Sequence, residues 1–135
     1  MTVKNQIEKF LADSKEIVFI RKEFGGFGGY SQVSRGLRDI INDGGLVKAG
    51  LGIYVKARFS SIDGKPIPII SVLEIGFLAL EKLGIKPDLS HATKDYSEGL
   101  STQMPMASVI NVGKSKTNRK IGFRKNLIRY QRDEK

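Results

Sequence analysis

Polar side chains that can read the edges of DNA bases gather between residues 31 and 38 of this chain. The set consists of Ser31, Gln32, Ser34, Arg35 and Arg38. Glutamine can pair with adenine and arginine with guanine N7 and O6, while serine hydroxyls bind bases or phosphates. The same residue types are also ordinary on a solvated helix surface. We therefore expect readout of the DNA major groove if one helix presents these side chains together.

A helix near residues 31–43 is expected to present them. The apolar side chains that repeat on its other face are Val33, Leu37, Ile40 and Ile41. This spacing stacks side chains on one side of a helix. The Ser31 hydroxyl is expected to cap the first turn, and Gly44 and Gly45 are expected to end the helix, because glycine adopts left-handed backbone angles at little cost.

A hairpin is expected to follow this helix. Two short apolar runs, Leu46–Val47 and Ile53–Val55, flank a turn predicted over Lys48–Gly52. Lys48 and Lys56 would then contact phosphates or the minor groove. A polar-faced helix that leads into a basic hairpin is the outline of a winged helix-turn-helix, in which the second helix of the motif enters the major groove.

The residues before this helix are expected to complete the domain. Val3–Asp13 has a helical apolar pattern that Thr2 can cap. Glu16–Ile20 is a β-branched run that predicts a short strand pairing with the hairpin. Arg21–Phe24 is expected to form a short helix, which the glycine-rich residues 25–29 end in a turn.

The glycine-rich turn does not fit a nucleotide-binding loop. Tyr30 and Ser31 follow the glycines, whereas the Walker pattern requires Gly-Lys-Ser/Thr and the dinucleotide fingerprint requires its own glycine spacing after a strand. Backbone amides at the start of the next helix stay candidates for binding a DNA phosphate.

The second half predicts a small α+β domain. After a linker expected over residues 60–68, Ser71 and Glu74 form a capping-box pattern that opens a helix ending near Leu83. This helix is apolar almost all round, which favours a core position, with a dimer contact as the alternative. Three short runs at 108–112, 119–123 and 127–130 predict a small antiparallel sheet.

The predicted fold class is therefore α+β, with two domains. Residues 1–59 would form the winged helix-turn-helix DNA-binding domain, and residues 60–135 the small α+β C-terminal domain. No apolar run approaches the roughly 20 residues of a membrane helix. With no cysteine and a polar N-terminus unlike a secretory signal, a cytoplasmic location is expected.

Positive charge dominates the chain, whose formal net charge is +9. Eight basic residues and no acid lie between Lys114 and Arg132. Such a balance suits a polyanionic partner, nucleic acid above all. The additional candidate contacts are Lys114, Lys116, Arg119 and Lys120. This tail could extend a DNA contact, bind RNA or form a solvated sheet face.

Residues suited to enzyme chemistry are scarce. His91 is the single histidine, and with Asp95 it would supply at most half of a metal site. Ser101 lacks the G-x-S-x-G surroundings of a nucleophile elbow. We expect no catalytic residues, no metal and no cofactor. A nucleic-acid-processing enzyme is an alternative that metal-dependent nuclease activity lost in His91→Ala would support.

Several segments together resemble a known family. They are Phe19–Phe24, Val33–Leu37, Asp43–Val47, Gly52–Tyr54, Gly99–Pro105 and Arg119–Gly122. In these segments the chain resembles the AbiEi-like antitoxins of bacterial type IV toxin–antitoxin systems and a short sister family of uncharacterised function. The Leu-Ser-Thr-Gln element that begins at Leu100 is the more specific part, because many regulators share the winged part.

The resemblance implies a transcriptional repressor that binds inverted repeats in its own promoter. Its partners would be double-stranded DNA and a nucleotidyltransferase-like cognate toxin, and a palindromic operator would favour a homodimer. The helix with Gln32, Ser34, Arg35 and Arg38 would be the DNA reader. The chain is shorter than the full antitoxins. The alternative is a protein-interaction module that neutralises a toxin or host factor without sequence-specific DNA binding.

Overall fold

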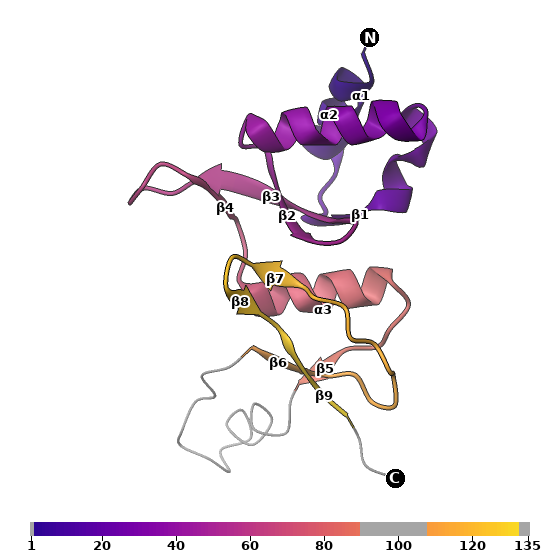
Figure 1. The fold of residues 1–135 in the computed structure, drawn as a ribbon, viewed down its shortest axis with the longest axis vertical. Coiled ribbons are helices and arrows are strands. Elements are labelled where there is room, and N and C mark those ends of the chain that lie inside the picture. The colour runs from indigo at the N-terminus through magenta and orange to yellow at the C-terminus, as the bar shows by residue number, and fades with distance from the viewer. Residues whose placement is uncertain (1, 90–107, 133–135) are drawn as a thin grey trace. The chain divides into compact units, whose positions relative to one another are not determined.

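The computed structural model describes residues 2–89 and 108–132. Its helices and small sheets form an α+β fold (Figure 1). Contacts divide the chain into two compact units, Met1–Ile70 and Ser71–Lys135. Within the described segments, no helix combines the length and the apolar character that crossing a membrane requires.

The first unit contains three helical segments and four strands. They are α1 (Val3–Asp13), β1 (Val18–Ile20), the 3₁₀ helix η1 (Arg21–Phe27), α2 (Tyr30–Asn42), β2 (Leu46–Gly50), β3 (Ile53–Phe59) and β4 (Pro66–Pro68). The sheet has the order β1-β3-β2, and β4 pairs with the last three residues of β3, Ala57–Phe59. All these pairs are antiparallel. The predicted pairing of the short first strand with the hairpin is confirmed.

The core of the first unit lies between the helices and the sheet. The apolar stripe of α2 is buried as predicted at Val33, Leu37 and Ile40. Ile7 of α1 and Phe19 of β1 are fully buried in the same cluster. Burying each of these large side chains stabilises the fold by about 1.5–3 kcal/mol, so the face of α2 opposite its charges is held firmly in place.

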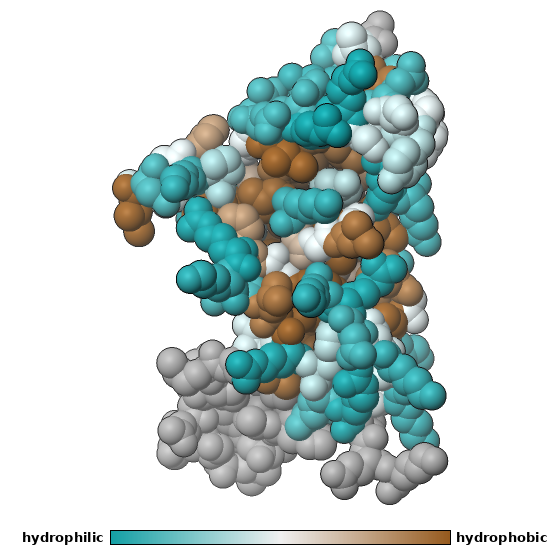
Figure 2. Space-filling model, in the orientation of Figure 1, coloured by the Kyte–Doolittle hydropathy of each residue, from teal (hydrophilic) through white to brown (hydrophobic). Residues whose placement is uncertain are grey.

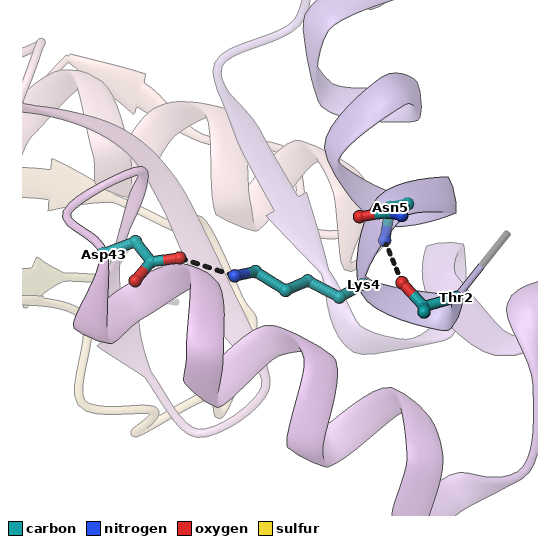
Figure 3. A network of polar contacts seen from close by, with 4 residues as sticks. All are labelled: Thr2, Lys4, Asn5 and Asp43. Carbon is teal, nitrogen blue, oxygen red and sulfur yellow. Dashed lines mark hydrogen bonds and ion pairs between the residues drawn. The ribbon is translucent and has the colours of Figure 1, made fainter.

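Polar contacts cap the start of α1 and join α1 to the end of α2 (Figure 3). The Thr2 hydroxyl accepts a hydrogen bond of 3.1 Å from the Asn5 amide, which confirms the predicted cap of α1. Lys4 Nζ lies 2.6 Å from Asp43 Oδ2 at the end of α2. The hydrogen bond to Asp43 raises the pKa of Lys4 above its ordinary value.

The start of α2 differs from the prediction. Gly29, and not Ser31, is the N-cap residue. Its amide donates to Gln32 Oε1 at 3.2 Å, so the glutamine side chain accepts from the N-cap amide as the third helical residue of a capping box does. Ser31 lies inside the first turn and is exposed. The preceding helix is a 3₁₀ helix extended to Phe27, because two consecutive glycines disfavour regular α geometry.

The hairpin and the segment after it are more regular than predicted. β2 continues through Lys48 to Gly50, and the reversal is confined to Leu51 and Gly52, whose φ is +71°. The predicted linker over residues 60–68 includes β4, which pairs with the end of β3. Residues 60–70 therefore remain with the first unit.

The second unit has one helix and five short strands in its described residues. They are α3 (Val72–Lys82), β5 (Asp88–Leu89), β6 (Val109–Asn111), β7 (Gly122–Phe123), β8 (Asn126–Leu127) and β9 (Arg129–Gln131). The prediction of one three-stranded antiparallel sheet is wrong. β6 lies between antiparallel β5 and parallel β9, while β7 and β8 form a separate hairpin. The hairpin reverses the chain a second time, so that β9 runs in the direction of β6.

Helix α3 begins with the predicted capping box. Ser71 Oγ accepts from the Glu74 amide at 3.2 Å, and Glu74 Oε1 accepts from the Ser71 amide at 3.4 Å. One face of the helix is buried, and a Cβ placed on Gly76 would lie only 2.6 Å from Ile110 Cδ1 of β6. The predicted core position is confirmed for this face.

Candidate nucleic-acid interface

The face of α2 opposite the core is polar and open to solvent. Ser31, Gln32, Arg35 and Arg38 are exposed, and Ser34 is half-buried. Figure 2 shows hydrophilic side chains over this helix. Within the described residues, Arg35 and Arg38 form no ion pair with a carboxylate. Both guanidinium groups are therefore free to bind an external anion or a base edge.

Two of the five predicted readers are occupied by contacts within the chain. Gln32 Oε1 holds the Gly29 amide, as described above. Ser34 Oγ accepts a hydrogen bond of 3.1 Å from Arg21 Nη1. Contact of these two side chains with a DNA base would require breaking their hydrogen bonds within the chain. Ser31, Arg35 and Arg38 are exposed and could contact DNA without such a change.

Arg21 was missed by sequence reasoning, although it helps to build this surface. Besides Ser34, it donates through Nη2 to the Tyr30 carbonyl oxygen at 2.8 Å, and its guanidinium lies 4.4 Å from the centre of the Tyr30 ring. These contacts fasten η1 to the first turn of α2. A lone arginine in a short predicted helix gave no signal for this role, because its partners follow 9 and 13 residues later.

A groove runs between α2 and the β2–β3 hairpin. Its volume is about 550 Å³. The cationic side chains that line it are Arg21, Arg38 and Lys48; Leu37, Ile41 and Tyr54 are among its apolar and aromatic lining residues. A smaller hollow of about 330 Å³ is lined by Tyr30, Ser31, Ser34, Arg35 and Arg38. Arg38 belongs to both, so this helix face and the hairpin share one continuous basic surface.

The two lysines predicted in the hairpin have different positions. Lys48 is exposed and lines the groove. Lys56 is half-buried, donates from Nζ to the Ser14 carbonyl oxygen at 2.7 Å and lies 5.9 Å from the centre of the Phe19 ring. Because its side chain is held against the end of α1, Lys56 is not among the residues that line the groove.

Two large side chains at the borders of the groove are unusually exposed. Tyr30, at the start of α2, has 78% of its surface exposed, and Leu51, at the hairpin tip, has 83%. Both line the groove. Neither was predicted as a contact, since an exposed aromatic or leucine has no distinctive sequence pattern.

A family comparison covers almost the whole chain, since a family model matches residues 4–133. The chain belongs to the DUF6088 family, a family of unknown function. Comparison with curated proteins and with solved structures gave no match. The DUF6088 match carries no link to the AbiEi-like antitoxins.

The second unit of this DUF6088 chain carries another basic surface. Lys114, Lys116, Arg119 and Lys120 are all exposed on the segment between β6 and β7. These four predicted contacts lie within one short loop and belong to a different unit from α2.

Several other sequence predictions fall outside the described residues. His91, Asp95 and Ser101 lie in the range 90–107, as does the segment Gly99–Pro105 that carried the more specific part of the resemblance.

Proposed function

We propose that this DUF6088 protein is a DNA-binding transcription regulator whose first unit is a winged helix-turn-helix, with α2 as the reading helix and the β2–β3 hairpin as the wing. The observation that carries the proposal is the pair of exposed arginines, Arg35 and Arg38, on a helix whose opposite face is buried. Arginine pairs with guanine through two parallel hydrogen bonds, which is the commonest specific contact in the major groove.

The groove supports the same proposal. Arg38 and Lys48 face it from the helix and from the hairpin, an arrangement suited to following a phosphate backbone beside the base edges. Contacts to phosphate position a protein on the duplex, and contacts to base edges specify the sequence. The net charge of +9 adds long-range attraction to any nucleic acid.

The biological part of the proposal rests on the resemblance to AbiEi-like antitoxins. The protein would repress its own promoter by binding an inverted repeat as a homodimer, and a nucleotidyltransferase-like toxin would be its partner. A palindromic operator matches two copies of one reading helix, each in its own half-site. A toxin gene next to the gene for this chain would support this part.

The test measures binding to a labelled duplex from the upstream promoter and to a scrambled duplex of equal length, by fluorescence anisotropy. We expect the unsubstituted protein, called the parent, to bind the promoter duplex more tightly than the scrambled duplex. Arg35→Ala and Arg38→Ala should each weaken promoter binding by about 1–3 kcal/mol and reduce that preference.

Lys9→Ala is the control, because it removes an exposed cation from α1, away from the groove lining. It should leave the preference unchanged. Equal losses on both duplexes for both arginine variants would show that these side chains touch only phosphate, and the proposal of sequence-specific reading would fail.

A protein-interaction module that neutralises a toxin is the second candidate. Exposed apolar side chains favour it on the β3–β4 arm, which consists of these two strands and residues 60–65 between them. Phe59 is 60% exposed and Ile62, between the two strands, is 95% exposed. Figure 2 shows hydrophobic surface at the end of this arm. Co-purification with the product of the adjacent gene, lost in Ile62→Ser, would support this function; a monomer that captures no such product would contradict it.

A further inference from the structure

The segment between β6 and β7 concentrates positive charge on an exposed surface. Lys114, Lys116, Arg119 and Lys120 lie within seven residues and are all exposed, and no acidic residue interrupts them. We call these four side chains the basic loop. None of them forms an ion pair within the described residues, so their charges are directed to solvent.

Arg132 holds the backbone of this loop in place. Its Nε donates to the Ser115 carbonyl oxygen at 2.8 Å, and its Nη2 donates to the Thr117 carbonyl oxygen and to Asn118 Oδ1, the latter at 3.1 Å. The Tyr130 hydroxyl donates to the Arg119 carbonyl oxygen. Tyr130 and Arg132, near the end of the described chain, therefore fix the backbone of the loop.

Shorter-range hydrogen bonds define the loop further. Asn111 Oδ1 accepts from the Gly113 amide at 2.7 Å, and the Ser115 amide donates to the Val112 carbonyl oxygen at 3.1 Å. Ser115 Oγ in turn accepts from the Thr117 amide at 3.3 Å. A loop ordered before binding loses less conformational entropy when a ligand arrives, so the four cations form a prearranged surface.

We propose that the basic loop binds the phosphate backbone of duplex DNA, as a second and sequence-independent contact in addition to α2. Lysine acts as a point charge toward phosphate, and arginine binds it with its planar fork. This inference rests on the proposed function, because that function makes DNA the partner; it adds a binding surface in the other unit.

The surroundings of the loop favour a duplex over a single strand. Single-strand binders stack successive bases on exposed aromatic rings. The Arg132 guanidinium lies 5.7 Å from the centre of the half-buried Tyr130 ring, and the Arg124 guanidinium lies 5.0 Å from that of Phe123. Nearby aromatic rings are thus already engaged by arginines, which leaves charge as the principal means of recognition.

The test is a salt series on the full-length chain, with the promoter duplex and the scrambled duplex as probes. In the loop variant, Lys114→Gln, Lys116→Gln, Arg119→Gln and Lys120→Gln are combined. Each phosphate contact contributes about 0.9 to the slope of log affinity against log salt. We expect the slope to become shallower by up to about 3.6 for four lost contacts, equally on both duplexes.

The matched control combines Lys9→Gln, Lys15→Gln, Lys65→Gln and Lys86→Gln, which removes the same charge from exposed positions elsewhere. If loop and control variants change the slope equally, general charge explains the effect and the inference is overturned. A slope unchanged by the loop variant overturns it as well.

The outcomes separate this inference from the proposed function. A parent that prefers the promoter, with a loop variant that behaves like the control, would contradict the inference alone. A parent that binds both duplexes equally, with a loop variant that loses slope on both, would support the loop contact and contradict promoter reading. Selective binding of duplex RNA in place of DNA would overturn the inference.

Arg132→Lys tests the prearrangement of the loop without changing its charge. Lysine cannot make the three contacts of the arginine fork at once, so we expect weaker binding of both duplexes at constant net charge. Arg129→Lys is the control, an exposed arginine on the adjacent strand. Equal affinities for the two variants, with unfolding temperatures equal to the parent's, would show that the Arg132 contacts do not contribute.

Discussion

At the scale of single residues, the same side-chain type performs opposite tasks. Arg21 and Arg132 donate hydrogen bonds to a serine hydroxyl and to backbone carbonyl oxygens of their own chain. Arg35 and Arg38 instead keep their guanidinium groups exposed to solvent. Arginine suits both tasks because its five N–H donors are fixed in one plane. Which task an arginine performs depends on what the fold places within its reach.

Tyr130 provides a prediction at this scale. Burial raises the pKa of its phenol above the ordinary value, against the opposing effects of a hydrogen bond with the Thr117 side chain and of the charges of Arg119 and Arg132. The folded chain therefore holds this proton more tightly than the unfolded chain, and the stabilisation is complete below about pH 10 and declines as pH rises through the folded pKa. Phenolate absorbance should show this late deprotonation.

The measurement compares the alkaline titration of the parent with that of Tyr130→Phe. Their difference is the titration of Tyr130 alone, and its midpoint should lie above the ordinary value of about 10. A midpoint below that value would contradict the burial of the phenol and weaken the argument that Tyr130 fastens the basic loop.

At the scale of elements, close approach of helix α1 to helix α2 determines how firmly the proposed reading surface is mounted. A Cβ on Gly36 of α2 would lie 3.3 Å from Ile7 Cδ1 and 3.4 Å from Lys4 Cα of α1. The Lys4–Asp43 pair joins the same two helices. The helix that displays Arg35 is thus supported directly behind its charged face by a glycine contact.

Gly36→Val should destabilise the first unit by about 1–3 kcal/mol, because the branched side chain has no room between the helices. Chemical denaturation followed by circular dichroism measures the loss. Gly26→Ala is the matched control, since nothing lies within 4 Å of a Cβ there. If Gly36→Val were as stable as the parent, the two helices would not be packed as closely as described.

At the scale of the whole chain, two units with separate cores carry two separate basic surfaces. The first surface lies on α2 and the hairpin, and the second on the loop held by Arg132. Sequence-specific and sequence-independent contacts to DNA have different requirements, since bases need exact geometry and phosphates need mainly charge. The two proposed contacts are placed on different units, so each can meet its own requirement.

Ser71→Ala tests the separation of the units. Loss of the capping box should cost about 0.5–2 kcal/mol and should be confined to the second unit. Native-state hydrogen exchange is the measurement: protection should fall in α3 and β6 but not in α1 or α2. An equal fall throughout the chain would show that the two units unfold as one.

Local patterns were sufficient to predict most of the elements. Helical apolar spacing located α1 and α2, the Ser71–Glu74 capping-box pattern located the start of α3, and turn residues located the hairpin. The exposure of Arg35 and Arg38 also followed from the sequence, because burying one face of a helix leaves the opposite face to solvent.

Only the tertiary structure decided the contacts between residues far apart in the chain. In the tertiary structure, Lys56 donates a hydrogen bond to the Ser14 carbonyl oxygen, Arg21 donates one to Ser34, and β9 pairs with β6 in parallel. The tertiary structure also joined Arg132 to a loop 15 to 17 residues earlier. Such partners leave no local periodicity, because they depend on where the whole chain returns. The sequence determined which residues are candidates for the proposed nucleic-acid contacts, and the packing decided which of these side chains are exposed and which are held by partners within the chain.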